Sequence, residues 1–267
     1  MILTKPLPYR EALDYLQQKS LLPTTGRTAE LEQLGSAITE RAAFSAAVTK
    51  AEHIQRVLDA AGNLVSGQVD FASQRLALKK YLQSEGYMPS EEDRGTLRDL
   101  SSDARLEVQV MTPVQMAQGY GYWKQGQDPA VLDAFPAQEF LRVEAREVPR
   151  SDWKERFTAA GGTVTEDGRM VALKNSPVWT KLSRFGQPYE PFDFGSGMGT
   201  EDRSRRVAMD LGLIDRDTEL MPQDRPFNQD LQATPEVRDQ NLRSLLEETG
   251  LGKFDTSGVF VFSAPTS

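Results

Sequence analysis

The chain has 267 residues, of which 39% are hydrophobic and 26% are charged, and its formal net charge at pH 7 is −8. This composition is typical of a globular protein that is long enough to bury a sizeable core. The acidic balance argues against a general DNA-binding surface, so we expect no strong nucleic-acid binding. Cysteine is absent and His53 is the one histidine, which excludes disulfides, thiol nucleophiles and most transition-metal sites. We therefore expect no cofactor and no metal.

Hydropathy points away from a membrane. No run approaches the roughly 20 apolar residues that a membrane span needs, and the N-terminal stretch MILTKPLPYR has no signal-peptide core. From the sequence we expect a soluble protein made in a cytoplasm, with no membrane partner.

The first part of the chain has helical periodicity. A short helix is expected around Tyr9–Leu16, ended by Pro23. A stripe of apolar residues from Thr28 to Leu58 predicts one long helix of about 50 Å, with Gly62 as its stop. His53 falls inside that helix, where a position at the surface or at the edge of the core is expected.

Two more helices are predicted at 69–84 and from Ser90 toward Val110. A new helix is expected to begin at Thr112, because threonine can cap a helix and Pro113 suits the first helical position. That helix would run over 112–126. A narrow face of small residues, suited to close approach of another helix, would be formed by Val114, Ala117 and Gly121.

The second half mixes strands and short helices. A strand is predicted over 138–145, and a β-hairpin over 163–173 with its turn at Asp167–Gly168. A short helix should begin at Ser176–Pro177, and Thr200 should cap another. The fold class is therefore α+β: a helical N-terminal half followed by a small α+β unit with an antiparallel sheet.

Residues 175–199 form an aromatic-rich connection between these elements. The sequence NSPVWTKLSRFGQPYEPFDFGSGMG places five large aromatic rings among prolines and glycines. Few of these residues continue a regular helix or strand, so we expect a shaped loop locked by its rings. The aromatic residues of 185–194 should form one buried cluster, because an exposed patch of that size would favour aggregation.

The C-terminal part is expected to be a polar excursion over 215–235, a helix over 236–249, and a terminal strand or apolar peg at 258–262. Three regions result. They are a helical arm and long-helix region at 1–126, a small α+β unit at 127–214, and the excursion, helix and strand at 215–267.

The sequence offers few candidate catalytic or ligand-binding residues. Glu190 and Asp193 flank Pro191, and such a carboxylate pair can perform acid–base work. Loop carboxylates that cap nearby amides are the alternative reading. The run GSGMG at 195–199 superficially resembles a phosphate-cradling loop, but no P-loop lysine follows it. Arginines at 203, 205 and 206 are interspersed with acidic residues, as on a solvated helix face.

Three sequence blocks, taken together, are similar to the phage Mu F-like minor head proteins, the head-morphogenesis family. The blocks are TPVQMAQGYGYWKQG at 112–126, FPAQEFLRVEAREVPR at 135–150, and the stretch from 170 to 199. The matching positions within and between them are Thr112, Ala117, Gly121, Phe135, Pro136, Asn175, Pro177, Trp179, Tyr189, Pro191 and Phe192. The family's Arg-Thr-Arg…His segment and the cysteine-bearing end of its loop are absent, and 194–197 reads Phe-Gly-Ser-Gly instead.

The resemblance implies a low-copy structural protein of a tailed-phage head and implies no catalysis. Its expected partners are the portal protein, the major capsid protein or both. Its expected location is the head interior or portal region of the virion, and the host cytoplasm during assembly. Its expected roles are procapsid assembly and, in some members of the family, DNA packaging or ejection. Two alternatives stay open: an enzyme or toxin-like effector with a site at Glu190 and Asp193, or a helical adaptor unrelated to phage.

Overall fold

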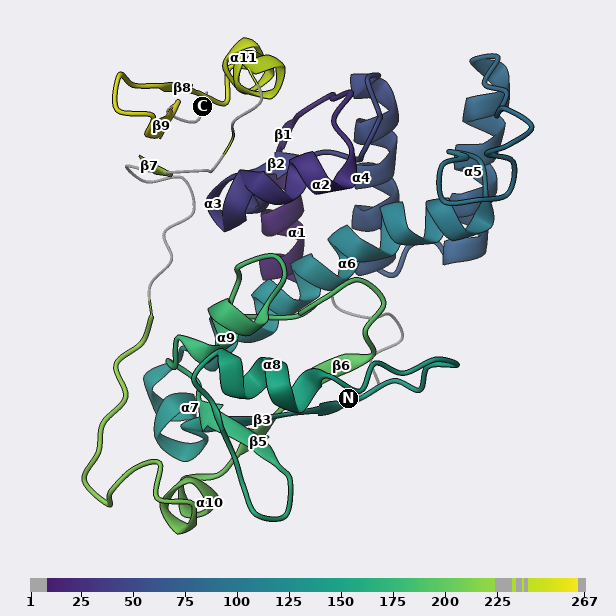
Figure 1. Ribbon diagram of the computed structural model, residues 1–267. Coiled ribbons are helices and arrows are strands. Elements are labelled where there is room, and N and C mark those ends of the chain that lie inside the picture. Colours follow the sequence, from purple (N-terminus) through teal and green to yellow (C-terminus); the bar gives the residue numbers. More distant parts are fainter. Residues whose placement is uncertain (1–8, 224–231, 234–236, 238–239, 264–267) are drawn as a thin grey trace. The chain divides into compact units, whose positions relative to one another are not determined.

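The computed structural model describes residues 9–223, 232–233, 237 and 240–263 (Figure 1). The chain divides into two compact units. The first combines residues 1–117 with 226–267, and the second comprises 118–225. These boundaries differ from the three consecutive regions expected from the sequence, because the C-terminal segment packs with the N-terminal helices. The antiparallel sheet and the surrounding helices confirm the α+β class.

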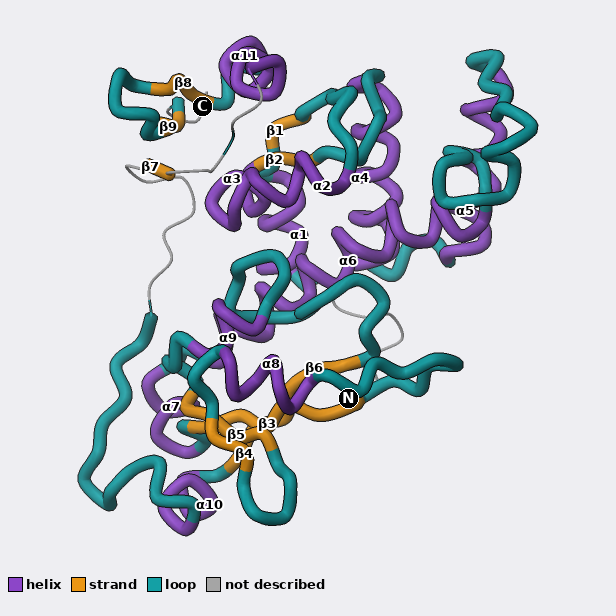
Figure 2. Tube along the Cα trace, viewed as in Figure 1, coloured by secondary structure: helices purple, strands orange, loops and turns teal. Residues whose placement is uncertain are grey.

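The first unit is mainly helical, with short strands (Figure 2). Its elements in chain order are α1 (Arg10–Gln17), β1 (Ser20–Leu21), α2 (Thr28–Leu31), a 3-10 turn (Glu32–Leu34), α3 (Gly35–Arg41), β2 (Ala42–Ala43), α4 (Ala51–Val65), α5 (Phe71–Ser84), the start of α6 (Asp103–Gly126), β7 (Gln232–Ala233), α11 (Gln240–Glu248), β8 (Gly252–Phe254) and β9 (Phe260–Phe262).

The predicted long helix from Thr28 to Leu58 is wrong. The chain breaks at Gly35, whose φ is +71°, and leaves helical geometry again at Ala42, which pairs in parallel with β1. Ala47 then has a φ of +56°. The apolar stripe that suggested one helix is real, but Leu34, Ile38 and Ile54 reach the core from three separate short elements.

The predicted helix start at Thr112 is also wrong, because α6 runs without interruption through Pro113. A proline inside a helix removes one backbone donor. The fully buried side chains of Leu106 and Val110, on the turns before the proline, and of Ala117, on the turn after it, hold α6 in the core. Thr112 is therefore an interior residue of α6 and caps nothing.

Residues 90–102 form turns instead of the predicted third helix. The carboxylate of Asp99, which is 4% exposed, accepts hydrogen bonds from the amides of Gly95 (2.9 Å) and Ser101 (2.8 Å). The hydroxyl of Tyr87 accepts from the amide of Leu100 at 2.9 Å. These side-chain partners compete with helical hydrogen bonding and fix the turns.

The C-terminal segment completes the core of the first unit. Leu22, Leu34 and Ile38 pack in one buried cluster with Leu246 and Phe260. The predicted terminal strand is present as β9, which lies between β7 and β8 in an antiparallel sheet. The predicted final helix is present as α11, and residues 236, 238 and 239 of its predicted start lie outside the described residues.

His53 is buried in α4 with only 2% of its surface exposed. Its Nε2 lies 3.4 Å from Oε1 of Gln109, and its Nδ1 has no hydrogen-bond partner among the described residues. Burial lowers the pKa of His53 below its usual range, because the charged imidazolium loses its hydration.

The first unit should therefore lose stability in mild acid. Below about pH 6.5 the unfolded chain protonates its histidine while folded His53 stays neutral, so the unfolded state binds the extra proton. The free energy of unfolding should therefore fall as the pH drops from about 7.5 to about 5.5. Urea unfolding of the wild type and of His53→Gln across this range measures the difference. Equal pH slopes in the two proteins would contradict the prediction.

The second unit is built on a four-stranded antiparallel sheet in the order β4–β5–β3–β6 (Figure 2). Its elements in chain order are the end of α6, α7 (Pro129–Ala134), β3 (Ala137–Arg142), α8 (Trp153–Ala159), β4 (Thr163–Val164), β5 (Met170–Leu173), α9 (Val178–Leu182), β6 (Met198–Arg203) and α10 (Arg205–Asp210). The predicted strand, the predicted hairpin with Gly168 at a φ of +84°, and the short helix bearing Trp179 are confirmed.

The two faces of this sheet bury different side chains, as the period of two in a strand requires. Phe140 and Met170 point to the side covered by α8 and α9. Ala137 and Val171 point to the other side, where Ala208 of α10 and Ile214 pack. The sheet is thus covered by helices on both faces (Figure 1).

Thr200 does not cap a helix, contrary to the sequence prediction. It lies in β6 opposite Phe140 of β3. Ser204 takes the capping role for α10, its side chain accepting from the amide of Val207. Pairing along all six residues of β3 outweighs the local helix-start pattern.

Candidate functional site

The connection from 183 to 199 is the candidate site, because it holds both carboxylates and three of the matched positions named above, Tyr189, Pro191 and Phe192. It leaves α9, returns along β6 and is pinned to the second unit at several points. Phe192 and Trp179 lie in the core, with 0% of each exposed and ring centroids 6.0 Å apart.

Phe140 of β3 is the centre of the aromatic core. Its ring makes edge contacts with Trp153 and Phe192, both at 5.1 Å between centroids. Trp179 in turn packs edge-on against Phe157 at 5.9 Å and donates its Nε1 hydrogen to the carbonyl of Leu173 at 2.7 Å. The core is therefore both apolar and hydrogen-bonded.

The aromatic residues of 185–194 do not form one cluster, and this part of the sequence prediction is wrong. Phe192 belongs to the Phe140 core, whereas Tyr189 packs against Tyr120 and Trp123 of α6 at 5.7 and 6.0 Å. Phe185 and Phe194 form a separate edge-to-face pair at 4.7 Å that is partly exposed. The rings lock the loop at separate places because prolines and glycines turn the chain between them.

Pro191 follows a cis peptide bond with Glu190. At this point the backbone comes close to α6: a methyl group placed on Gly119 would lie 2.9 Å from the carbonyl carbon of Glu190 and still closer to its oxygen. Gln187, fully buried, donates weakly to the carbonyl of Tyr189 at 3.4 Å. The close contact thus falls at Gly119, whereas the sequence pattern pointed to Gly121, a buried residue two positions further along α6.

Ala117 is fully buried, and Thr112 and Ala117 belong to the part of α6 in the first unit. Of the positions proposed from the resemblance, the structure brings together Trp179 and Phe192. Tyr189 packs against α6 instead, and Pro191, which directly precedes Phe192, is buried.

Glu190 is held by β6. Its Oε1 accepts hydrogen bonds from the amide of Thr200 at 2.6 Å and from the hydroxyl of the same residue at 3.2 Å. Burial nevertheless raises the pKa of Glu190, and these hydrogen bonds offset only part of that effect. The side chain ties the loop to the sheet.

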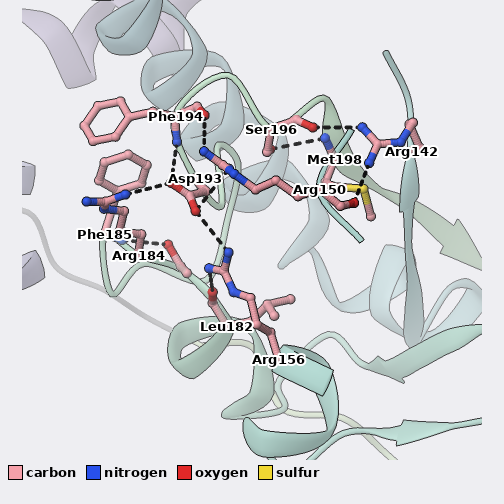
Figure 3. Close-up of polar contacts among 11 residues, drawn as sticks. Arg142, Arg150, Arg156, Leu182, Arg184, Phe185, Asp193, Phe194, Ser196 and Met198 are labelled. Atoms are coloured by element: carbon pink, nitrogen blue, oxygen red, sulfur yellow. Dashed lines mark hydrogen bonds and ion pairs between the residues drawn. The ribbon is translucent and has the colours of Figure 1, made fainter. Parts of the chain in front are cut away.

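Asp193 is the polar centre of the connection (Figure 3). It is 5% exposed, and its carboxylate pairs with Arg150 (3.1 Å), Arg156 (3.0 Å) and Arg184 (3.4 Å). The same carboxylate accepts from the amide of Phe194 at 2.8 Å. A buried carboxylate surrounded in this way is satisfied.

The two carboxylates therefore have different partners. Glu190 bonds to Thr200, and Asp193 bonds to arginines and its own loop. In this arrangement both side chains act as anchors of the connection, which is the capping alternative considered for them from the sequence.

Sequence reasoning missed the arginines. Arg150 and Arg156 lie far from Asp193 in the chain, and no periodic pattern links them to it. The one sequence feature that could have indicated such partners is the charged arm at 143–152, which carries arginines close to the end of a predicted strand.

Within the described residues, no three side chains of the histidine, cysteine, aspartate and glutamate types are grouped as a metal site would need. The helices among those residues include none of the length and apolar character that crossing a bilayer demands. Comparison with family models, with curated proteins and with solved structures found no match for the chain.

Phe192→Ala should destabilise the second unit strongly. Removing a fully buried phenyl ring leaves a cavity against Phe140 and Trp179, which costs about 3–5 kcal/mol. Phe185→Ala is the matched control within the same connection; its partly exposed ring should cost only about 1 kcal/mol. Thermal unfolding followed by tryptophan fluorescence measures both. Similar melting temperatures for Phe192→Ala and the wild type would refute the core role of this ring.

Gly119→Ala should also destabilise the protein, because the new methyl group would collide with the backbone of Glu190. Overpacking of this kind costs about 1–3 kcal/mol. Gly126→Ala, in the same helix, is the control: its nearest neighbour would be Nζ of Lys174 at 3.5 Å, an ordinary contact. If chemical denaturation ranked the two variants equally, the close approach at Gly119 would be in error.

Proposed function

We propose that this chain is a structural minor head protein of a tailed phage that acts near the portal during procapsid assembly and takes part in DNA packaging or ejection. Its partners in this proposal are the portal protein, the major capsid protein or both. The proposal rests on the family resemblance of three sequence blocks, and on how the structure arranges residues from them.

The observation that carries the proposal is that residues from all three blocks pack together within the second unit, which contains residues 118–126 of the first block and the whole of the other two. Tyr120 and Trp123 come from the first block, Phe140 from the second, and Tyr189 and Phe192 from the third. Phe192 lies on Phe140, and Tyr189 lies on both residues of the first block. Parts of all three blocks thus pack in one unit, while Thr112 and Ala117 of the first block belong to the other.

The hydrogen bonds made by the two carboxylates also support the proposal. An enzyme reading would need Glu190 or Asp193 to face a substrate, whereas both make hydrogen bonds that hold the connection. A rigid loop fixed by rings and ion pairs suits a protein that acts by docking.

The docking surface is proposed to lie in the N-terminal helical part, residues 1–86. A deletion of that part is a poor test, because Leu78 and Val57 share a buried cluster with Leu106 of α6. Single surface changes are better. Leu76 on α5 is 53% exposed and offers an apolar contact.

Co-sedimentation with portal-containing procapsids of a tailed phage tests the proposal. The wild type should sediment with portal-containing particles, and Leu76→Glu should weaken the association about tenfold, as loss of one buried leucine contact predicts. Val148→Glu is the matched control, since Val148 is 86% exposed but lies in the second unit.

Two results would count against these proposals. Failure of the wild type to bind particles at low or high salt would reject the assembly role and favour the adaptor alternative. Normal binding by Leu76→Glu together with loss of binding by Val148→Glu would move the docking surface to the second unit.

A further inference from the structure

The first unit contains a cavity of about 510 Å³ between α11 and the turn at 23–27, which precedes α2. Thr49 and one face of α11 line the cavity together with this turn. Leu242 and Leu245 on that face also pack in the buried cluster that contains Leu31 of α2. The cavity therefore borders the hydrophobic core of the unit, and its volume is in the range that small organic ligands occupy.

The turn at 23–27 is fixed by hydrogen bonds to a neighbouring segment. The amide of Thr24, which is 2% exposed, donates to the carbonyl of Val48 at 2.7 Å. The amide of Ala47 donates to the carbonyl of Gly26 at 2.9 Å. These bonds hold the turn from both ends, so this wall of the cavity is formed before a ligand binds, and binding has less ordering to perform.

Two side chains of opposite charge line the cavity from different walls. Arg27 belongs to the turn, and Glu248 is the last residue of α11. Within the part of the chain that the structure describes, neither side chain forms an ion pair or a hydrogen bond. Glu30 also lines the cavity, and its Oε2 accepts from the amide of Arg27 at 2.7 Å. The cavity thus has a positive group and a negative group that face the same space without pairing with each other.

The other lining residues supply neutral polar groups and apolar surface. Thr25, Thr49, Asn241 and Ser244 have side chains that make no hydrogen bond to any described residue. The apolar surface comes from Pro23 and the two leucines of α11. Among the described residues that line the cavity none is aromatic, which disfavours ligands that bind by ring stacking, such as nucleobases.

We propose that this cavity binds a small zwitterion, either a free amino acid or a short peptide with free ends. The ligand carboxylate pairs with Arg27, its ammonium group pairs with Glu248, and its apolar part lies on Leu242 and Leu245. A guanidinium binds a carboxylate through paired, charge-assisted hydrogen bonds. A ligand with only one charge would leave the charged group of the opposite wall without a partner. This site goes beyond the proposed function and does not depend on it.

The test is an amide NMR titration of the full chain with L-leucine and two blocked analogues. Leucinamide lacks the carboxylate, and N-acetyl-L-leucine lacks the ammonium group. We expect saturable shifts at residues 24–27 and 241–248 with leucine. Each analogue should bind about tenfold more weakly, because it loses one charged partner.

Substitutions assign the two charges. Arg27→Gln should weaken leucine binding about tenfold and leave leucinamide binding unchanged, because leucinamide has no carboxylate to pair with Arg27. Glu248→Gln should weaken leucine binding to a similar extent and leave N-acetyl-L-leucine binding unchanged. Arg206→Gln and Glu92→Gln are the matched controls, since these side chains are 91% and 88% exposed and do not line the cavity. Both controls should bind leucine like the wild type.

The site is overturned if neither leucine nor the dipeptide Leu-Leu gives saturable shifts at the cavity, or if the blocked analogues bind as tightly as leucine. Unchanged leucine affinity in a folded Arg27→Gln also overturns it. If a variant does not fold, the blocked analogues measured on the wild type decide alone. Tighter binding of Leu-Leu than of leucine assigns the cavity to a peptide, and the reverse order assigns it to a free amino acid.

Discussion

The buried carboxylate of Asp193 is the interaction on which the shape of the second unit depends. It joins three segments: the arm at 143–152 through Arg150, α8 through Arg156, and the connection itself through Arg184. A buried charge is tolerated only when it is paired and hydrogen-bonded, and loss of its partners is strongly destabilising. The rings of Phe140, Trp179 and Phe192 supply the burial, while Asp193 fixes where the loop above them can lie.

Much of the fold could be predicted from local patterns. The hairpin at Asp167–Gly168, the helix bearing Trp179 and the terminal strand at 260–262 each depend on a turn residue or a periodicity that lies within a few positions. The failures share one cause, which is that a distant partner overrides the local preference. Ala42 leaves its helix to pair with β1, and Thr200 joins β3 instead of capping a helix.

The candidate site divides in the same way. The sequence shows that residues 175–199 are rich in aromatic residues, prolines and glycines. Burial of Phe192 and Trp179 could be predicted from this, because an exposed aromatic patch would favour aggregation. The partition of the rings between the Phe140 core and α6 could not be read from the sequence, because it depends on how the chain turns at Pro191. Nor could the arginines around Asp193 be found, since ion pairs between distant residues leave no periodic trace.

The division of the chain into units has a consequence for biosynthesis. Residues 118–225 are inserted between two parts of the other unit, so the chain leaves that unit and returns to it. During translation the inserted unit is complete once its own strands have been made. The apolar side chains of Leu22, Leu34 and Ile38, by contrast, must wait for Leu246 and Phe260 before they are fully covered. Residues 1–117 are thus made before the inserted unit but can finish folding only after it, and apolar surface that stays exposed on a nascent chain favours aggregation and chaperone binding.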